Sequence, residues 1–282
     1  MIFFEGKKEA ERILEETKKK IEQGNLSPTL AIVRAGNNPE VDLYIRNKKK
    51  AAHKVGIKIF SYSFSEKASE YEIIDKIREL NEDVLVDGII VQLPLPEKVD
   101  TSKVISSVDP KKDVDGFHEV NRRLLKSDNS YFLPVLPLAI MKSIESATEE
   151  LEEKKVVTLC NSDIFGNTIE NFFQKNKIDS DYILVNSKSI SQIKPDISSA
   201  DIVISVCGKP RFIKGYMVKE GSILIDAGIK FFKKGVIGDV DQKSVEEKAS
   251  FITPVPGGIG PLTVAYLLKN VYLAAKNDSR RK

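Results

Sequence analysis

Residues 86–96 read Val86-Asp-Gly-Ile-Ile-Val-Gln-Leu-Pro-Leu-Pro96, an apolar strand that ends at two prolines. Two apolar runs precede it, at 30–33 and 57–62, and segments with helical periodicity, at 41–54 and 69–82, separate the three runs. Strands that alternate with helices predict a parallel sheet covered by helices. We therefore expect an α/β domain in the N-terminal half of the chain.

A second alternating series follows Pro137. The expected elements are a helix at 138–152, a strand at 156–159, a helix at 166–176, and then apolar strands at 183–185, 202–206 and 223–225 with turn residues between them. This spacing is typical of a doubly wound nucleotide-binding domain. A charged amphipathic helix is expected before the first strand, at 5–23, and an apolar helix that starts with Pro261 is expected at 261–276.

The composition is that of a globular protein with room for two domains. The chain has 282 residues, of which 41% are hydrophobic and 30% charged, and its formal net charge is only +3. This balance argues against a strongly basic nucleic-acid-binding surface. No apolar run reaches the roughly 18 residues of a membrane span, and the charged N-terminus does not resemble a signal peptide. We expect a cytoplasmic protein with neither nucleic-acid nor membrane partners.

Metal chemistry is not expected. Cys160 and Cys207 are the only cysteines, His53 and His118 the only histidines, and no zinc-ligand spacing occurs among them. Catalysis would therefore depend mainly on Lys, Tyr, Asp or Glu.

Tyr44 and Lys48 form the first candidate pair. Their i, i+4 spacing on the expected 41–54 helix places both side chains on one face. A lysine that is partly removed from water can lose its proton near neutral pH. The alternative is that Lys48 belongs to a solvated run, because Lys49 and Lys50 follow it.

Gln92 is the second candidate. It lies at the carboxyl end of an expected strand, where open α/β sheets bind their ligands, and its amide could position a catalytic group. The alternative is a polar residue that merely caps a turn.

Asp113 and Asp115 form the third candidate, within Lys112-Asp-Val-Asp-Gly-Phe-His118. Two carboxylates two residues apart would share one face of an extended segment. The alternative is a turn with solvated aspartates, because no metal-binding loop continues the motif.

Residues 253–261 read Thr253-Pro-Val-Pro-Gly-Gly-Ile-Gly-Pro261 and form the most specific of the four segments. Its glycines allow the backbone to approach a ligand closely. Pro261 as the first helical residue would leave a helix N-terminus open to a polar or anionic group.

The first expected strand-to-helix turn of the second domain is Cys160-Asn-Ser-Asp-Ile-Phe-Gly166. Only Gly166 remains of a dinucleotide fingerprint there. The turn after strand 183–185 reads Asn186-Ser187-Lys188 and lacks the carboxylate that favours NAD. A hydroxyl and an ammonium group suit the 2′-phosphate of NADP, so NADP is the expected cofactor and NAD the alternative. Lys188 could equally be a solvated loop residue.

In this order, the segments resemble the bifunctional methylenetetrahydrofolate dehydrogenase/cyclohydrolase family over nearly the whole chain. The motifs that carry the resemblance are Tyr44-Ile-Arg-Asn-Lys48, 88–95, 112–118, 200–210, 225–229, 238–241 and 252–261. The resemblance implies oxidation of 5,10-methylenetetrahydrofolate with a nicotinamide cofactor and hydrolysis of the methenyl product to 10-formyltetrahydrofolate. It implies tetrahydrofolate derivatives as ligands and a homodimer.

The resemblance also assigns roles to residues. Lys48 would be the catalytic lysine, Gln92 would orient it, Tyr44 would pack on the folate, and Asp115 would hold the pterin. The implied substrate contacts are Tyr44, Val91, Gln92, Leu93, Asp115, Pro256, Gly257, Gly258 and Gly260. The implied cofactor contacts are Cys160, Asn161, Ser162, Gly166, Ser187, Lys188, Cys207, Ile229 and Thr263.

The fold that the resemblance implies is an N-terminal α/β catalytic domain, 1–136, and a Rossmann-like NAD(P)-binding domain, 137–260. The C-terminal helix, 261–282, would return to the first domain. Where the family has Gly-Arg-Ser, this chain has Cys160-Asn161-Ser162. Two alternatives therefore stay open: mainly a cyclohydrolase with weak dehydrogenase activity, or a non-catalytic folate- or nucleotide-binding regulator.

Overall fold

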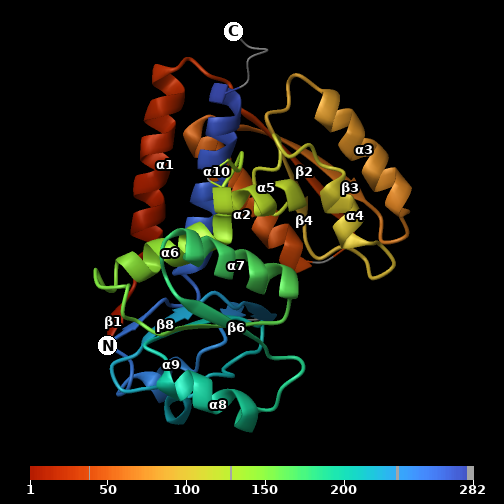
Figure 1. The fold of residues 1–282 in the computed structure, drawn as a ribbon. Coiled ribbons are helices and arrows are strands. Elements are labelled where there is room, and N and C mark those ends of the chain that lie inside the picture. Colours follow the sequence, from red (N-terminus) through yellow and green to blue (C-terminus); the bar gives the residue numbers. More distant parts are fainter. Residues whose placement is uncertain (38, 128, 233–234, 278–282) are drawn as a thin grey trace. The chain divides into compact units, whose positions relative to one another are not determined.

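The computed structural model describes residues 1–37, 39–127, 129–232 and 235–277, which form two compact units (Figure 1). The three-strand unit comprises Ala10–Val135 and the C-terminal stretch from Val264. The six-strand unit comprises Met1–Glu9 and Leu136–Thr263. The division falls inside three helices, α1 (Gly6–Gln23), α6 (Val135–Glu145) and α10 (Ile259–Asn277).

The three-strand unit has a parallel sheet in the order β3-β2-β4. Helices of different lengths surround the sheet, with six residues in α4 and 17 in α2. The bounds in this unit are β2 Thr29–Ala35, α2 Pro39–Val55, β3 Lys58–Phe64, α3 Glu70–Glu82, β4 Gly88–Gln92, α4 Thr101–Ser106, α5 Glu119–Leu124 and the short 3₁₀ turn Leu125–Ser127. A capping box between Ser69 and Glu72 starts α3.

Two apolar layers hold this sheet, one on each face. Leu30, Ile32 and Ile90 pack with the apolar sides of α2 and α10. Ala31, Val33 and Ile89, which alternate with them along the strands, pack with α3 and α4 on the other face. The closing helix therefore returns to the core of the three-strand unit, as expected.

The six-strand unit has a fully parallel sheet in the order β1-β11-β8-β7-β5-β6. Its bounds are β1 Ile2–Phe3, α6 Val135–Glu145, β5 Val156–Cys160, α7 Asp163–Lys175, β6 Ser180–Leu184, α8 Ile190–Ser199, β7 Ile202–Val206, the 3₁₀ turn Gly215–Met217, β8 Ile223–Asp226, β9 Lys230–Phe232, β10 Gly235–Ile237, α9 Gln242–Val245 and β11 Phe251–Ile252. Figure 1 shows α6 and α7 on one side of the sheet and α8 and α9 on the other. This is the doubly wound architecture that the strand spacing predicts.

Four local expectations differ from the structure. Between strands 183–185 and 202–206 only turn residues were expected, but α8 lies there. Residues 1–9 were expected with the N-terminal domain, but β1 pairs with β11 in the six-strand unit. The helix expected at 138–152 ends at Glu145, because the following residues turn and the Ser146 hydroxyl donates to the Lys142 carbonyl. The last helix begins at Ile259, so Pro261 is its third residue rather than its first.

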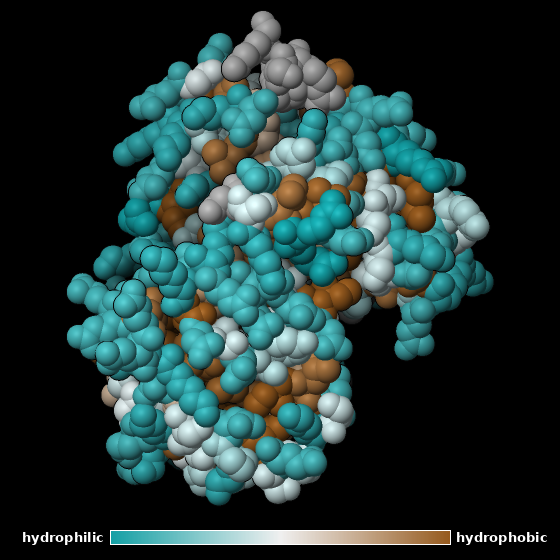
Figure 2. Space-filling model, in the orientation of Figure 1, coloured by the Kyte–Doolittle hydropathy of each residue, from teal (hydrophilic) through white to brown (hydrophobic). Residues whose placement is uncertain are grey.

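Hydrophilic residues cover most of the face shown in Figure 2, and its exposed apolar residues form small patches. None of the described helices has the length and apolar character needed to cross a bilayer.

Candidate active site

The three-strand unit brings Lys48 and Gln92 together. Lys48 lies on α2, and Gln92 is the last residue of β4, where Pro94 prevents the strand from continuing. The Lys48 Nζ donates a hydrogen bond of 2.7 Å to the Gln92 Oε1. The Gln92 Nε2 in turn donates to the Leu93 carbonyl at 3.0 Å, which fixes the orientation of the amide. Lys48 is thus not a member of a solvated run.

Asp115 lies close enough to Lys48 for the two charges to interact. Both side chains are half-buried, and Tyr44, also half-buried, lies one turn before Lys48 on α2. The predicted catalytic residues therefore come from three separate segments of one unit.

A close backbone approach positions Asp115. The Ile89 N–H donates to the Lys112 carbonyl at 2.7 Å, so the segment before Asp115 runs along β4. A Cβ on Gly88 would lie 2.6 Å from a Val114 methyl carbon, and glycine is needed there for this approach. From α10, the Asn270 Nδ2 donates to the Val114 carbonyl at 2.9 Å.

Asp113 has a different role from Asp115, although the sequence places them two apart. Asp113 is buried and accepts hydrogen bonds from the Gly116 and His118 N–H groups, at 3.2 and 2.8 Å, and from the Asn121 side chain, at 2.9 Å. It therefore holds the turn that follows Asp115. Sequence analysis missed the partners Asn121 and Asn270, because no motif marks a single asparagine.

Burial shifts the pKa values of this cluster. Burial lowers the pKa of Lys48, and the charge of Asp115 opposes that shift. Burial raises the pKa of Asp115 to about 6, with Lys48 opposing the shift and Asp113 adding to it. The amine and the carboxyl are thus brought closer to neutral pH from opposite sides, which favours proton transfer.

The side chains of Val91 and Leu93 do not lie beside Lys48 as that of Gln92 does. The side chain of Val91 packs toward the α3 face of the sheet, opposite to Gln92, because neighbouring residues of a strand alternate between faces. Only its backbone is available on the Lys48 side. Leu93 is 44% exposed beyond the end of the strand.

In the six-strand unit, the stretch from the end of β5 to the first turn of α7 contains four of the predicted cofactor residues. Cys160 is buried at the end of β5, and the Ser162 hydroxyl caps α7 by accepting from the Phe165 N–H at 3.4 Å. The Asn161 Nδ2 donates to the Cys207 carbonyl at 3.1 Å. A Cβ on Gly166 would lie 2.3 Å from the Tyr182 ring, so this glycine allows α7 to pack closely on β6.

Two lysines lie near the carboxyl end of β6. Ser187 and Lys188 are exposed in the turn after the strand, and the Ser187 hydroxyl donates to the Leu184 carbonyl at 3.2 Å. The Lys209 Nζ reaches over from the turn after β7 and donates to the Val185 carbonyl at 3.2 Å. Sequence analysis missed Lys209, although it lies in the 200–210 motif.

Two buried aspartates hold the turns that carry Cys207 and Ile229. Asp239 accepts hydrogen bonds from the Ser205 hydroxyl and from three consecutive backbone N–H groups, at 207, 208 and 209. Asp226 accepts from the N–H groups of Gly228, Asp239 and Val240. Burial raises the pKa of the Cys207 thiol to about 12, so this cysteine is not a nucleophile at neutral pH.

The glycine-rich loop belongs to the six-strand unit. Pro256 is exposed, Gly257 has a φ of +114°, and Gly258 is buried. A Cβ on Gly6 would lie 2.1 Å from the Gly258 carbonyl oxygen, so the first residue of α1 supports the loop directly. Gly260 and Thr263 lie in the first turns of α10, where the Thr263 hydroxyl donates to the Gly260 carbonyl at 2.8 Å.

The six-strand unit has a doubly wound sheet with polar turns at its carboxyl edge, as nucleotide-binding domains have. The three-strand unit has a lysine, Lys48, that is held by the amide of Gln92 beside the carboxylate of Asp115, as an acid–base site requires. These two features define a nucleotide-dependent α/β enzyme. The sequence model of the tetrahydrofolate dehydrogenase/cyclohydrolase catalytic domain matches residues 4–115, and that of the NAD(P)-binding domain of the same family matches residues 134–279. The chain belongs to this family, as the motifs predict.

Relatives support the same assignment along the full length. The bifunctional protein FolD of Acetivibrio thermocellus is 39% identical over 281 residues, which cover 98% of each chain. The solved FolD structure from Campylobacter jejuni is 35% identical, with a TM-score of 0.90 over 98% of this chain and 99% of that one. FolD from Trypanosoma brucei, solved with NADP cofactor and an inhibitor, is 28% identical, with a TM-score of 0.92 over 99% and 98%. The expected two-domain α/β fold and the enzyme class are thereby confirmed.

Proposed function

We propose that this chain oxidises 5,10-methylenetetrahydrofolate with NADP and hydrolyses the methenyl product to 10-formyltetrahydrofolate, with Lys48 as the proton-transferring residue. The observation that carries the proposal is the hydrogen bond of 2.7 Å from Lys48 to Gln92, with Asp115 beside the same ammonium group.

The cyclohydrolase step requires a base rather than a strong nucleophile. The methenyl form is a stabilised cation, so water can attack its one-carbon centre once a proton is removed from that water. Lys48, whose pKa is lowered by burial, can take this proton as a neutral amine. Gln92 accepts from Lys48 and so aims the amine.

Asp115 and Tyr44 would bind the folate in this proposal. A carboxylate can accept two N–H groups from the pterin ring, and a phenol ring can stack on a flat heterocycle. The support for Asp115 is its fixed position, which Gly88, Asp113 and Asn270 determine. The backbone of 91–93 and the loop 256–260 are the other proposed substrate contacts.

The six-strand unit fits a dinucleotide. Gly166 allows the close helix packing that dinucleotide-binding turns need, and Ser162 starts α7 at the carboxyl edge of the sheet. When bound, the nicotinamide supplies hydride acceptance, and the protein supplies alignment. The residues proposed to hold the cofactor are Cys160, Asn161, Ser162, Ser187, Lys188, Cys207, Ile229 and Thr263.

One observation favours a second candidate, a cyclohydrolase with weak dehydrogenase activity. Asn161 is uncharged, and its amide is committed to the Cys207 carbonyl at 3.1 Å. It therefore offers no charge to a cofactor phosphate, unlike the arginine of the resembled motif. Parallel assays of methylenetetrahydrofolate oxidation and methenyltetrahydrofolate hydrolysis separate the two candidates. A hydrolysis rate that greatly exceeds oxidation at saturating NADP would favour the second.

Substitution of Lys48 tests the proposed mechanism. Lys48→Met should reduce hydrolysis of methenyltetrahydrofolate to less than about a tenth, a barrier increase above roughly 1.4 kcal/mol, while folate binding stays detectable. Lys50→Met, an exposed lysine on the same helix, is the matched control and should retain activity. A Lys48→Met enzyme with more than about a tenth of the wild-type rate would contradict the assignment.

The assembly and location are part of the proposal as well. A homodimer is the form that the resemblance implies, and light scattering after gel filtration tests it. A mass of one chain, 31.5 kDa, at assay concentration would contradict the dimer. A cytoplasmic location stays a prediction.

A further inference from the structure

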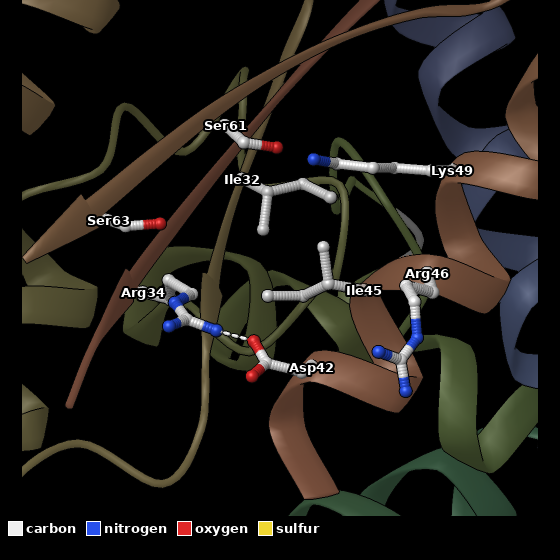
Figure 3. Close-up of a pocket in the computed structure, with 8 residues that line it drawn as sticks. All are labelled: Ile32, Arg34, Asp42, Ile45, Arg46, Lys49, Ser61 and Ser63. Carbon is white, nitrogen blue, oxygen red and sulfur yellow. Dashed lines mark hydrogen bonds and ion pairs between the residues drawn. The ribbon is translucent and has the colours of Figure 1, made fainter. Parts of the chain in front are cut away.

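A polar cavity lies in the three-strand unit, outside the Lys48–Gln92 contact. Its volume is about 280 Å³, and it lies between α2 and the neighbouring strands β2 and β3 (Figure 3). The residues that line it are Ile32, Arg34, Asp42, Ile45, Arg46, Lys49, Ser61 and Ser63. None of them has a role in the proposed reaction.

The lining carries two positive charges in excess. Arg34 forms an ion pair with Asp42, the single carboxylate among the lining residues. The exposed side chains of Arg46 and Lys49 therefore have no counter-charge among the lining residues. Figure 3 shows the Lys49 ammonium group reaching across the cavity toward Ser61, above Ile32 and Ile45. Cations gathered in one concavity attract an anion and repel one another in its absence.

A buried donor in the lining also lacks an acceptor. The Arg34 Nε is buried and has no hydrogen-bond partner, and the Arg34 side chain is only 15% exposed. A buried N–H without a partner destabilises the folded state, so such a group calls for an explanation. An acceptor inside the cavity would satisfy it.

Hydroxyl groups complete the set of donors. Ser63 pairs in register with Arg34, so both side chains leave the sheet on the same face, and Ser61 lies two residues earlier on that face. Donors therefore come from β2, from β3 and from successive turns of α2. Convergence from three elements suits a tetrahedral anion better than a planar carboxylate, and a dianion would balance the two excess charges.

We propose that this cavity binds a phosphate group, either inorganic phosphate or the terminal phosphate of a small phosphomonoester. Arg34, Arg46 and Lys49 supply the charge, and Ser61 and Ser63 supply neutral donors. Because Arg34 also pairs in register with Gln92, the bound phosphate lies on the same sheet face as the Lys48–Gln92 contact, one strand away. The proposal does not depend on the proposed reaction.

The test compares two charge-matched double variants. Arg46→Gln with Lys49→Gln removes the two unbalanced cations from the cavity, and Lys50→Gln with Lys54→Gln removes two exposed cations from the same helix outside it. Binding of inorganic phosphate and of glycerol 3-phosphate is measured by ³¹P NMR titration at constant ionic strength, with chloride as the reference anion. Saturating NAD, which has no phosphomonoester group, is present, so that the nucleotide site does not take up the probes.

The wild-type chain and the outer double variant should bind at least one probe, and the cavity double variant should bind it at least about fivefold more weakly. The probe that binds more tightly distinguishes free phosphate from a phosphomonoester. Binding of neither probe by the wild type would overturn the proposal, as would affinities of the two double variants within about twofold of each other. Thermal unfolding of both double variants without phosphate confirms that each is folded.

Discussion

Burial shifts the pKa values of Lys48 and Asp115 in opposite directions. Water would keep the amine charged and the carboxyl ionised over most of the neutral range. Partial burial lowers the pKa of the amine and raises that of the carboxyl to about 6, and their mutual attraction limits both shifts. The pair can therefore change protonation at a pH where neither residue would do so in water.

Asp115→Ala should weaken folate binding by about 1.5–3 kcal/mol, as expected for a lost hydrogen bond to a charged group. The affinity for NADP should stay nearly unchanged, because Asp115 and the nucleotide turns belong to different units. Folate affinity of the wild type should also fall as the pH is lowered through about 6, since protonation removes the accepting carboxylate. Titration calorimetry at several pH values checks both effects. Equal losses for folate and NADP would indicate a structural role for the 113–116 turn.

The preference of the enzyme for NADP over NAD tests whether Lys188 or Lys209 binds the cofactor. The wild type should prefer NADP to NAD, and Lys188→Ala should lower kcat/KM for NADP by about tenfold while leaving that for NAD nearly unchanged. Lys209→Ala is the comparison, because its ammonium group lies at the end of the same strand, 3.2 Å from the Val185 carbonyl oxygen. A preference for NAD, or an NADP preference that survives Lys188→Ala, would remove Lys188 from the site.

Among the elements, the turn after β7 depends on one buried carboxylate. The two oxygens of Asp239 accept four hydrogen bonds, and three of these come from the backbone of 207–209. Asp239→Asn replaces one accepting oxygen by an N–H group that faces other donors, so the free energy of unfolding should fall by about 3 kcal/mol. NADP affinity should fall with it, because Cys207 and Lys209 lie in this turn.

Asp241→Asn provides the matched control for that substitution. Asp241 is a partly buried neighbour whose side chain makes no capping hydrogen bond, so its loss should cost less than about 0.5 kcal/mol. Urea denaturation and NADP titration of both variants give the comparison. Similar stabilities for the two variants would contradict the anchoring role of Asp239.

Elements with strong periodicity could be predicted from the sequence, and those fixed by distant partners could not. Helices α1, α2 and α3 and strands β2, β4 and β7 start and end within about two residues of the expected bounds. Strand β1 is only two residues long, and it forms because it pairs with β11, which lies far along the chain. No local pattern can reveal such a partner, which is why residues 1–9 were placed in the wrong unit.

For the whole molecule, the same contrast holds for the candidate site. The sequence predicts a shared site for Lys48, Gln92 and Asp115, because their motifs follow one another in the order of the resembled family. In the structure these three residues lie in one cluster. The residues that hold them, such as Asn121 and Asn270, act through single hydrogen bonds and leave no spacing to recognise. The phosphate cavity could not be foreseen either, because its lining comes from three elements and has no sequence motif.

Asp226 should make the stability of the folded chain depend on pH. Burial raises its pKa to about 7, against about 3.9 in an unfolded chain. Between about pH 4 and pH 7, Asp226 is therefore protonated in the folded state and ionised in the unfolded state. The contribution of Asp226 to the free energy of unfolding is at its full value below about pH 4. It is lost as the pH rises through about 7.

Asp226→Asn cannot titrate and should flatten that dependence. Its amide N–H would face the backbone donors of Gly228, Asp239 or Val240, so the variant should be less stable at every pH. Its free energy of unfolding should nevertheless fall less than that of the wild type between about pH 5 and pH 8. Urea denaturation of the wild type and of Asp226→Asn across this range, at constant ionic strength, measures the two slopes. Parallel curves for Asp226→Asn and the wild type would show that Asp226 does not exchange its proton on unfolding.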